Sequence, residues 1–212
     1  MKPYNYIVIE GNIGAGKTTL AKMLSGRFDA RLILERYYDN PFLPKFYSDP
    51  EKYSFHLELS FLADRYSQLN KDLNNRDLFQ PLTISDYYFM KSLIYSRATL
   101  TEDEYKLYRQ VFDIMYSNTP KPDLYIYLHL SLDNLMRNIQ NRGRTFEQGI
   151  QKDYLVKIQD GYMDFFKQQS DLKILMIDIN NLDFNAKYSD FEKIVEIIFG
   201  NEYHQGLNKV IP

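Results

Sequence analysis

A run of residues near the start of the chain has the composition and spacing of a phosphate-binding loop. It reads Gly-Asn-Ile-Gly-Ala-Gly-Lys-Thr from Gly11 to Thr18, which fits the pattern G-x-x-x-x-G-K-[ST] without a gap. Glycines at these positions let successive backbone N–H groups converge on phosphate oxygens at a helix N-terminus. In this pattern Lys17 contacts the β- and γ-phosphates, and the Thr18 hydroxyl coordinates Mg²⁺. The predicted ATP contacts are Gly11, Asn12, Ile13, Gly14, Ala15, Gly16, Lys17, Thr18 and Thr19.

A glutamate and a pair of arginines have the chemistry that a transferring phosphoryl group requires. Glu35 ends an expected strand, where ligand crevices of α/β proteins lie, and its carboxylate can accept the proton of an attacking hydroxyl. The alternatives are that Glu35 only caps the strand, or pairs with Arg36, which would depress the pKa of Glu35. Arg142 and Arg144 bracket Gly143, which can bend so that both guanidinium groups stabilise charge in the transition state.

These residues are separated by an alternating pattern of expected strands and helices. Short apolar runs predict strands, and apolar residues at every third or fourth position predict helices. Such alternation favours a three-layer α/β fold, with a parallel sheet whose central strand leads into the phosphate-binding loop. Two prolines in the segment 39–44 exclude a helix interior there. The expected strands are 4–10, 32–35, 82–85, 123–130 and 173–178, and the expected helices are 17–28, 50–73, 90–97, one from Thr101, one around 132–139, 154–168 and 190–199.

The overall composition limits the class of protein. The chain has 212 residues, of which 44% are hydrophobic and 25% charged, so we expect one soluble domain over 1–212. A formal net charge of -2 provides no basic excess for a nucleic-acid partner. Cysteine is absent, which excludes disulfides and thiolate metal sites and suits a cytoplasmic location. No stretch approaches the roughly 20 apolar residues that span a bilayer, so we expect no membrane partner.

Three segments after the phosphate-binding loop are similar to a known family. They are 39–47 (DNPFLPKFY), 55–65 (FHLELSFLADR) and 142–147 (RGRTFE). Together with the loop they resemble the deoxynucleoside kinases, most closely the bacterial deoxyguanosine and deoxyadenosine kinases, over about 4–199. The resemblance implies a P-loop kinase fold with a five-stranded parallel sheet, an arginine-rich lid at about 142–150, and a homodimer. It also implies that ATP, with Mg²⁺, phosphorylates the 5′-hydroxyl of a deoxynucleoside.

The resemblance also implies roles for individual residues. Glu35 matches the general base, and Asp86 matches a strand-end acid that helps to hold Mg²⁺ and orients the phosphates. The next residue is usually arginine in the family but is Tyr87 here, which removes a positive charge near the reacting oxygens. The lid residues Arg142 and Arg144 are expected to supply replacement charge.

Four further residues match the family's contacts to the sugar and to ATP. Tyr47 and Glu147 match the pair that binds the sugar 3′-hydroxyl and crowds a 2′-hydroxyl, although Tyr47 can equally be a packing residue. Asp183 and Phe184 match the loop around the adenine of ATP.

Glu58 and Arg65 match the family's contacts to the nucleobase. They lie two turns apart on one face of the expected helix, and charges buried there need partners. Many relatives have glutamine where Glu58 stands. A carboxylate only accepts hydrogen bonds, so it suits the N1–H and N2–H₂ donors of guanine better than the N1 acceptor and N6–H₂ donor of adenine. This favours deoxyguanosine. The alternatives are that Glu58 contacts the base indirectly, or that it forms an ion pair with Arg65, either buried or on a solvated helix face.

Two other functions share the phosphate-binding loop. A switch GTPase would need D-x-x-G and N-K-x-D motifs, and neither occurs in the chain. A nucleoside-monophosphate kinase, such as a thymidylate kinase, would need extra positive charge near the acceptor's phosphate, and no such group is evident. The sequence therefore predicts an ATP- and Mg²⁺-dependent deoxynucleoside kinase, probed by assay with each deoxynucleoside and each monophosphate.

Overall fold

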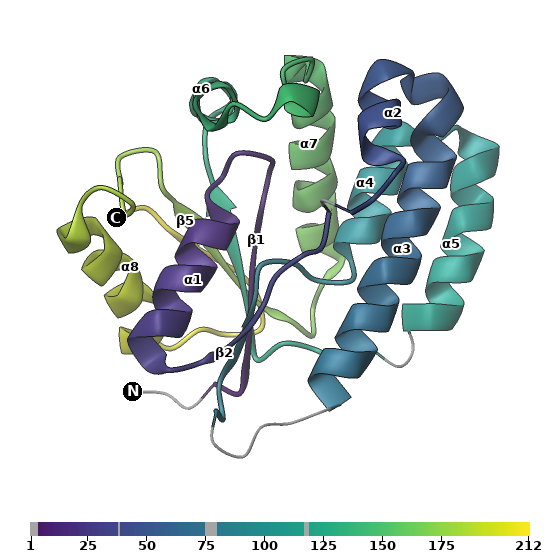
Figure 1. Cartoon of the computed structure of the whole chain (residues 1–212). Helices are drawn as coiled ribbons and strands as arrows, with labels where there is room; N and C mark the ends of the chain where they lie inside the picture. The colour runs from purple at the N-terminus through teal and green to yellow at the C-terminus, as the bar shows by residue number, and fades with distance from the viewer. Residues whose placement is uncertain (1–3, 38, 75–79, 117–118) are drawn as a thin grey trace.

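The computed structural model describes residues 4–37, 39–74, 80–116 and 119–212, and in them a parallel sheet lies between layers of helices (Figure 1). The strand order is β2-β3-β1-β4-β5-β6, and every pair of neighbouring strands is parallel. The expected three-layer α/β fold is confirmed, with β1 inside the sheet. The strands are β1 (Tyr6–Gly11), β2 (Arg31–Ile33), β3 (Thr83–Ser85), β4 (Leu124–His129), β5 (Lys173–Asp178) and β6 (Gly206–Val210).

The helices cover both faces of the sheet. Helices α1 and α8 lie on one side of it, and α3, α4, α5 and α7 lie on the other (Figure 1). None of the helices in the described ranges is long and apolar enough to cross a membrane. The helices are α1 (Lys17–Phe28), α2 (Leu43–Ser48), α3 (Pro50–Asn74), α4 (Lys91–Thr99), α5 (Glu102–Tyr116), α6 (Leu132–Arg142), α7 (Lys152–Gln168) and α8 (Tyr188–Gly200), with a 3₁₀ turn η1 (Thr145–Glu147).

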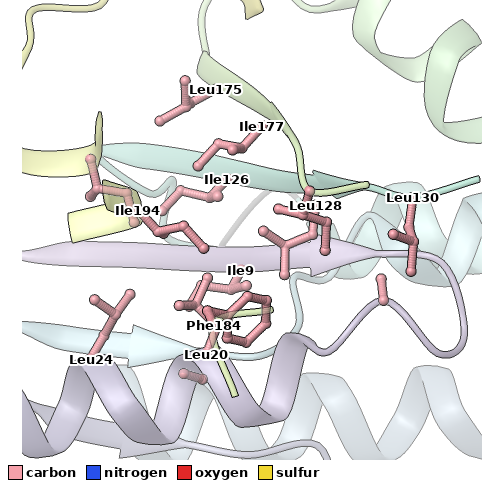
Figure 2. Close-up of a cluster of buried hydrophobic side chains, with 14 of the residues drawn as sticks. Ile9, Leu20, Leu24, Ile126, Leu128, Leu130, Leu175, Ile177, Phe184 and Ile194 are labelled. Atoms are coloured by element: carbon pink, nitrogen blue, oxygen red, sulfur yellow. The ribbon is translucent and has the colours of Figure 1, made fainter. Parts of the chain in front are cut away.

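The central strand β1 is buried on both faces, because its side chains alternate between two cores. Ile7 and Ile9 belong to a mainly aliphatic core that includes side chains of α1 and α8. Figure 2 shows Ile9 in this core with Leu20 and Leu24 of α1 and Ile194 of α8. Tyr6 and Val8 face an aromatic core that includes Tyr127 and the side chains of α7. This packing fixes the end of β1, and with it the start of the phosphate-binding loop.

Within the described ranges the sheet has six strands, so the expected number of five is wrong. The additional strand, β6, pairs with β5 from Lys173↔Gly206 to Ile177↔Val210. Its residues are partly buried or exposed rather than buried, because β6 lies at the edge of the sheet. Asn208 and Lys209 interrupt the apolar run that would have predicted a strand.

The segment 39–44 is not irregular throughout, as its two prolines had suggested. Helix α2 begins at Leu43, and Pro44 occupies its first turn, where a missing N–H costs no helical hydrogen bond. Leu43 and Phe46 are buried against Leu57 and Phe61 of α3. The short helix therefore presents the residue that follows Phe46, Tyr47, beside α3.

Candidate active site

The phosphate-binding loop connects β1 to α1 and is held open by hydrogen bonds to other elements. Gly14 and Gly16 have φ angles of 85° and 87°, in the left-handed region that favours glycine. The Asn12 side chain donates to the carbonyl of Leu155 at 2.8 Å, and the Asn138 side chain donates to the carbonyl of Gly14 at 2.9 Å. The loop and the first turn of α1, residues 14–19, line a cavity of about 830 Å³. These backbone N–H groups and the helix N-terminus suit a polyphosphate.

Replacing Gly14 by alanine should weaken ATP binding at least about tenfold, because a left-handed backbone costs a residue with a Cβ roughly 1–2 kcal/mol. The added Cβ would also lie 2.9 Å from the carbonyl oxygen of Leu135 and 3.1 Å from Ile139, so the loop would have to shift. Gly26→Ala is the matched control. It lies inside α1, and apart from the backbone of that helix and the neighbouring residues, no described atom lies within 4 Å of the added Cβ. Gly26→Ala should therefore stabilise the fold by roughly 0.5–1 kcal/mol. Equal ATP affinity in both variants, by calorimetric titration, would contradict the prediction.

Glu35 lies just beyond the end of β2 and is held by two cations from different helices. The Arg65 guanidinium of α3 donates to Glu35 Oε1 at 2.8 Å through Nε and lies 2.7 Å away through Nη2. The Lys91 ammonium of α4 donates to Glu35 Oε2 at 2.5 Å. Burial alone would raise the pKa of Glu35, but the charges and hydrogen bonds of Lys91 and Arg65 outweigh it and lower the pKa to about 2. Glu35 is therefore ionised, and its partners are Arg65 and Lys91, not Arg36, which the sequence had offered as an alternative.

Lys91 is a residue of the site that the sequence analysis did not single out. It is 5% exposed, the first residue of α4, and lies near Lys17, whose pKa is lowered to about 8 by burial and then by the like charge of Lys91. Lys91 thus provides a positive charge on the segment where Tyr87 replaced the expected arginine. The available signal was a lysine inside the aromatic run 87–92, which has no other charged residue.

Asp86 joins the end of β3 to the loop and to Glu35. Its Oδ2 accepts a hydrogen bond from the Thr18 hydroxyl, and its Oδ1 accepts one from the Glu35 backbone N–H at 2.7 Å. A hydroxyl and a carboxylate are hard oxygen ligands of the kind that Mg²⁺ takes, so Thr18 and Asp86 fit that ion. No cluster of three or more His, Cys, Asp or Glu side chains occurs within the described ranges.

A second cavity lies between the loop, α2 and α3, and the predicted substrate residues line it. Within it Glu58 is 2% exposed. Its Oε1 lies 3.1 Å from the Thr99 hydroxyl, and its Oε2 is buried with no hydrogen-bond partner among the described residues. Burial raises the pKa of Glu58 to about 7. Glu58 and Arg65 do not pair with each other here, since Arg65 is bound to Glu35. The residues of this cavity that had been predicted from the sequence are Ile13, Lys17, Thr18, Glu35, Tyr47, Glu58, Arg65, Asp86, Arg142, Arg144 and Glu147.

The lid arginines are organised by a buried carboxylate. Glu147, in η1, is 5% exposed and forms ion pairs with Arg142 through Oε2 and with Arg144 through Oε1, the latter at 3.1 Å. Arg144 also donates to the hydroxyl of Tyr37. Tyr47 packs its ring on Phe146, with centroids 5.9 Å apart, so the two residues predicted to hold the sugar lie on adjacent elements. Gly143 has a φ of 68° and ends α6, which turns the chain into the lid.

The two residues predicted to embrace adenine lie in the cavity beside the loop, with different exposures. Asp183 is exposed and accepts a hydrogen bond from the Ala186 backbone N–H at 3.1 Å. Phe184 is 6% exposed and belongs to the aliphatic core drawn in Figure 2, so it also has a packing role.

The two cavities meet at a small group of charged and hydroxylated side chains. One cavity contains the phosphate-binding loop, and the other contains the carboxylates Glu35 and Glu58. The residues that line both cavities are Lys17, Thr18, Arg142 and Arg144. A group bound in the first cavity and a hydroxyl bound in the second would therefore meet among three cations, beside an ionised carboxylate. This arrangement suits transfer of a phosphoryl group between two molecules.

Comparison with known proteins gives matches over nearly the whole chain. The family described as "Deoxynucleoside kinase" matches residues 7–202. A deoxyguanosine kinase of Bacillus subtilis (strain 168) is 40% identical over 195 residues, which cover 89% of this chain and 93% of the relative. A deoxyadenosine kinase of Lactobacillus acidophilus is 30% identical over 201 residues, which cover 91% and 94%.

Solved structures show the same fold. The structure of a deoxyadenosine kinase from M. mycoides with bound dATP superposes with a TM-score of 0.78 at 24% sequence identity. The superposition covers 91% of this chain and 98% of that one.

Proposed function

This chain belongs to the deoxynucleoside kinase family and is an ATP-dependent phosphotransferase, and from that premise we propose that its acceptor is a purine deoxynucleoside, deoxyguanosine before deoxyadenosine. The single observation that carries the acceptor proposal is the composition of the second cavity. It combines an ionised Glu35 with a buried carboxyl at Glu58 and opens onto the cations of the phosphate-binding loop. The comparisons support a purine, since relatives named for deoxyguanosine and for deoxyadenosine both match.

In the proposed mechanism, each side of the site holds one substrate. The phosphate-binding loop cradles ATP through its backbone N–H groups, with Lys17 near the β- and γ-phosphates, and the loop around Asp183 and Phe184 borders the adenine. The deoxynucleoside lies between α2 and α3, with Tyr47 and Glu147 at its sugar and Glu58 and Arg65 at its base. The 5′-hydroxyl then lies near Glu35.

Glu35 accepts the proton of the 5′-hydroxyl as the hydroxyl oxygen bonds to the γ-phosphorus and the bond to the leaving ADP oxygen breaks. Lys91 and Arg65 keep Glu35 ionised in the free enzyme. Arg142 and Arg144 donate to the equatorial oxygens of the transferring group, where negative charge is distributed in the transition state. In this proposal the lid arginines leave their ion pairs with Glu147 to do so.

Mg²⁺ completes the proposed site. Thr18 and Asp86 would hold the ion, which would neutralise charge on the phosphate oxygens. Asp86 also accepts a hydrogen bond from the Glu35 backbone N–H, so the carboxylate that would hold the metal also positions the base.

The proposed acceptor is tested by measuring ADP release with Mg-ATP and, separately, each deoxynucleoside and each deoxynucleoside monophosphate. We expect turnover with deoxyguanosine to exceed that with deoxyadenosine above neutral pH, and both to exceed the pyrimidines. Chelating Mg²⁺ should abolish turnover. Turnover led by a pyrimidine would overturn the purine proposal, and turnover on a monophosphate alone would indicate a nucleoside-monophosphate kinase.

We further propose one kinase domain over the chain, acting in purine salvage in the cytoplasm as a homodimer. Two observations on α5 support a subunit contact: Leu107 and Ile114 are 53% and 76% exposed although both are large and apolar. Sedimentation analysis tests the dimer, and a monomer at micromolar concentration would refute it.

A further inference from the structure

One oxygen of the Glu58 carboxyl has a hydrogen-bond donor, and the other has none in the part of the chain that the structure describes. The Thr99 hydroxyl lies 3.1 Å from Glu58 Oε1 and 3.0 Å from the carbonyl oxygen of Tyr95. Glu58 Oε2 is buried in the cavity and has no hydrogen-bond partner among the described residues. A proton on Oε2 would make this oxygen a donor, and loss of the proton would make it an acceptor.

The groups around Glu58 have opposing effects on its pKa, which brings the pKa close to neutral pH. Burial raises the pKa of Glu58, Glu35 at the end of β2 raises it further, and Arg65 of α3, the Thr99 hydrogen bond and Lys91 of α4 lower it, with a result of about 7. The hydroxyl of Tyr108, on α5, donates to the Glu58 carbonyl at 3.3 Å. The other titratable groups that line the same cavity are Lys17, Tyr37, Tyr47, Asp86, Tyr95, Arg142, Arg144, Glu147 and Tyr154.

The two forms of this carboxyl match different purines. A charged carboxylate presents two acceptors, which fit the N1–H and N2–H₂ donors of guanine. A neutral carboxyl presents one acceptor and one donor, which fit the N6–H₂ donor and the N1 acceptor of adenine. The unpartnered Oε2 of Glu58 would accept from guanine N1–H when the carboxyl is charged and would donate to adenine N1 when it carries the proton.

We propose that the proton on Glu58 selects the base, with the charged carboxylate recognising guanine and the neutral carboxyl recognising adenine. This inference rests on the proposed function, in which Glu58 contacts the base. Its consequence is a change of substrate preference with pH: the enzyme favours deoxyadenosine below the transition and deoxyguanosine above it.

The test is a competition assay in which deoxyguanosine and deoxyadenosine share one reaction with Mg-ATP. The ratio of their kcat/KM values cancels every pH effect common to both substrates, including effects on Lys17 and ATP. If each base requires one form, the ratio should rise on the order of 100-fold from one pH unit below the transition to one above it. The transition should lie near pH 7.

Two variants separate Glu58 from the other groups that titrate. Glu58→Gln has a fixed acceptor and a fixed donor, so the ratio should become independent of pH. Thr99→Val keeps the shape of the side chain and removes a hydrogen bond that lowers the pKa of Glu58, so the transition should move to higher pH. The second variant keeps the carboxyl and provides a test if Glu58→Gln does not fold.

The outcomes distinguish the inference from the function on which it rests. Phosphorylation of both purines at a ratio that changes less than about twofold over this range would overturn the inference and leave the purine kinase intact. A ratio that changes equally in Glu58→Gln would assign the effect to another group and would also overturn it. Absence of phosphorylation of either purine would remove the proposed function itself.

Discussion

Replacing Glu35 by glutamine should lower kcat on the order of 10²–10⁴-fold, the range expected for removing a general base. The amide keeps the size of the side chain but cannot take the proton of the 5′-hydroxyl. ATP binding should remain, because Glu35 lines the acceptor cavity and not the cavity beside the loop. The measurements are kcat at saturating Mg-ATP and deoxyguanosine, and ATP affinity by equilibrium titration.

A loss of stability must be separated from this loss of catalysis. Glu35 neutralises Arg65 and Lys91, whose side chains are 4% and 7% exposed, and breaking a buried ion pair costs roughly 3–5 kcal/mol. Glu102→Gln is the matched control, since it breaks an ion pair with Arg97 in which both side chains are more than half exposed. Rates are compared well below the melting temperature of each variant. Turnover of Glu35→Gln equal to that of the control would remove Glu35 from its role.

Removing the guanidinium group of Arg142 or Arg144 should lower kcat about 10³-fold or more, the lower end of the range for an arginine that stabilises a transferring phosphoryl group. The loss should appear in the single-turnover rate, with ATP affinity changed far less, because these contacts strengthen in the transition state. Glutamine is the informative substitution at both positions. Lysine keeps the charge but not the planar group of donors, so it should recover only part of the rate.

The control for the lid variants is Arg109→Gln, which removes an exposed guanidinium of α5 that lies 3.8 Å from Asp113. It should not change the single-turnover rate. A lid variant that raised KM for ATP and kept its single-turnover rate would show that the arginine contributes uniform binding and not catalysis.

The features predicted from sequence are those determined by neighbouring residues. The phosphate-binding loop is contiguous in sequence. Its glycines, lysine and threonine recur at fixed spacing, so the pattern predicted both the position of the loop and its binding of phosphate. The alternation of strands and helices gave the order of the elements. Asp86 and Glu35 were identifiable because both stand at the ends of expected strands.

The features that escaped prediction depend on side chains that are distant in sequence. Arg65 and Lys91, the partners of Glu35, lie 30 and 56 residues away from it, so the adjacent Arg36 was the only visible candidate. Whether Glu58 pairs with Arg65 was left open, and the competition of Glu35 for that arginine decided it. Glu147 was predicted only as a sugar contact, because its hold on both lid arginines follows from the 3₁₀ turn that buries it.

The sixth strand determines which strand lies at this edge of the sheet, where its backbone is open to pairing with other molecules. Without β6, the edge would be β5, whose run of Ile174, Leu175, Met176 and Ile177 is apolar and would leave a row of N–H and C=O groups open to another chain. Such an edge is a template for aggregation. The edge that β6 presents instead has an exposed lysine, Lys209, and lysine on an edge strand discourages further pairing. The consequence of β6 is thus greater colloidal stability. It covers the apolar strand β5 and discourages the edge-to-edge pairing that leads to aggregation.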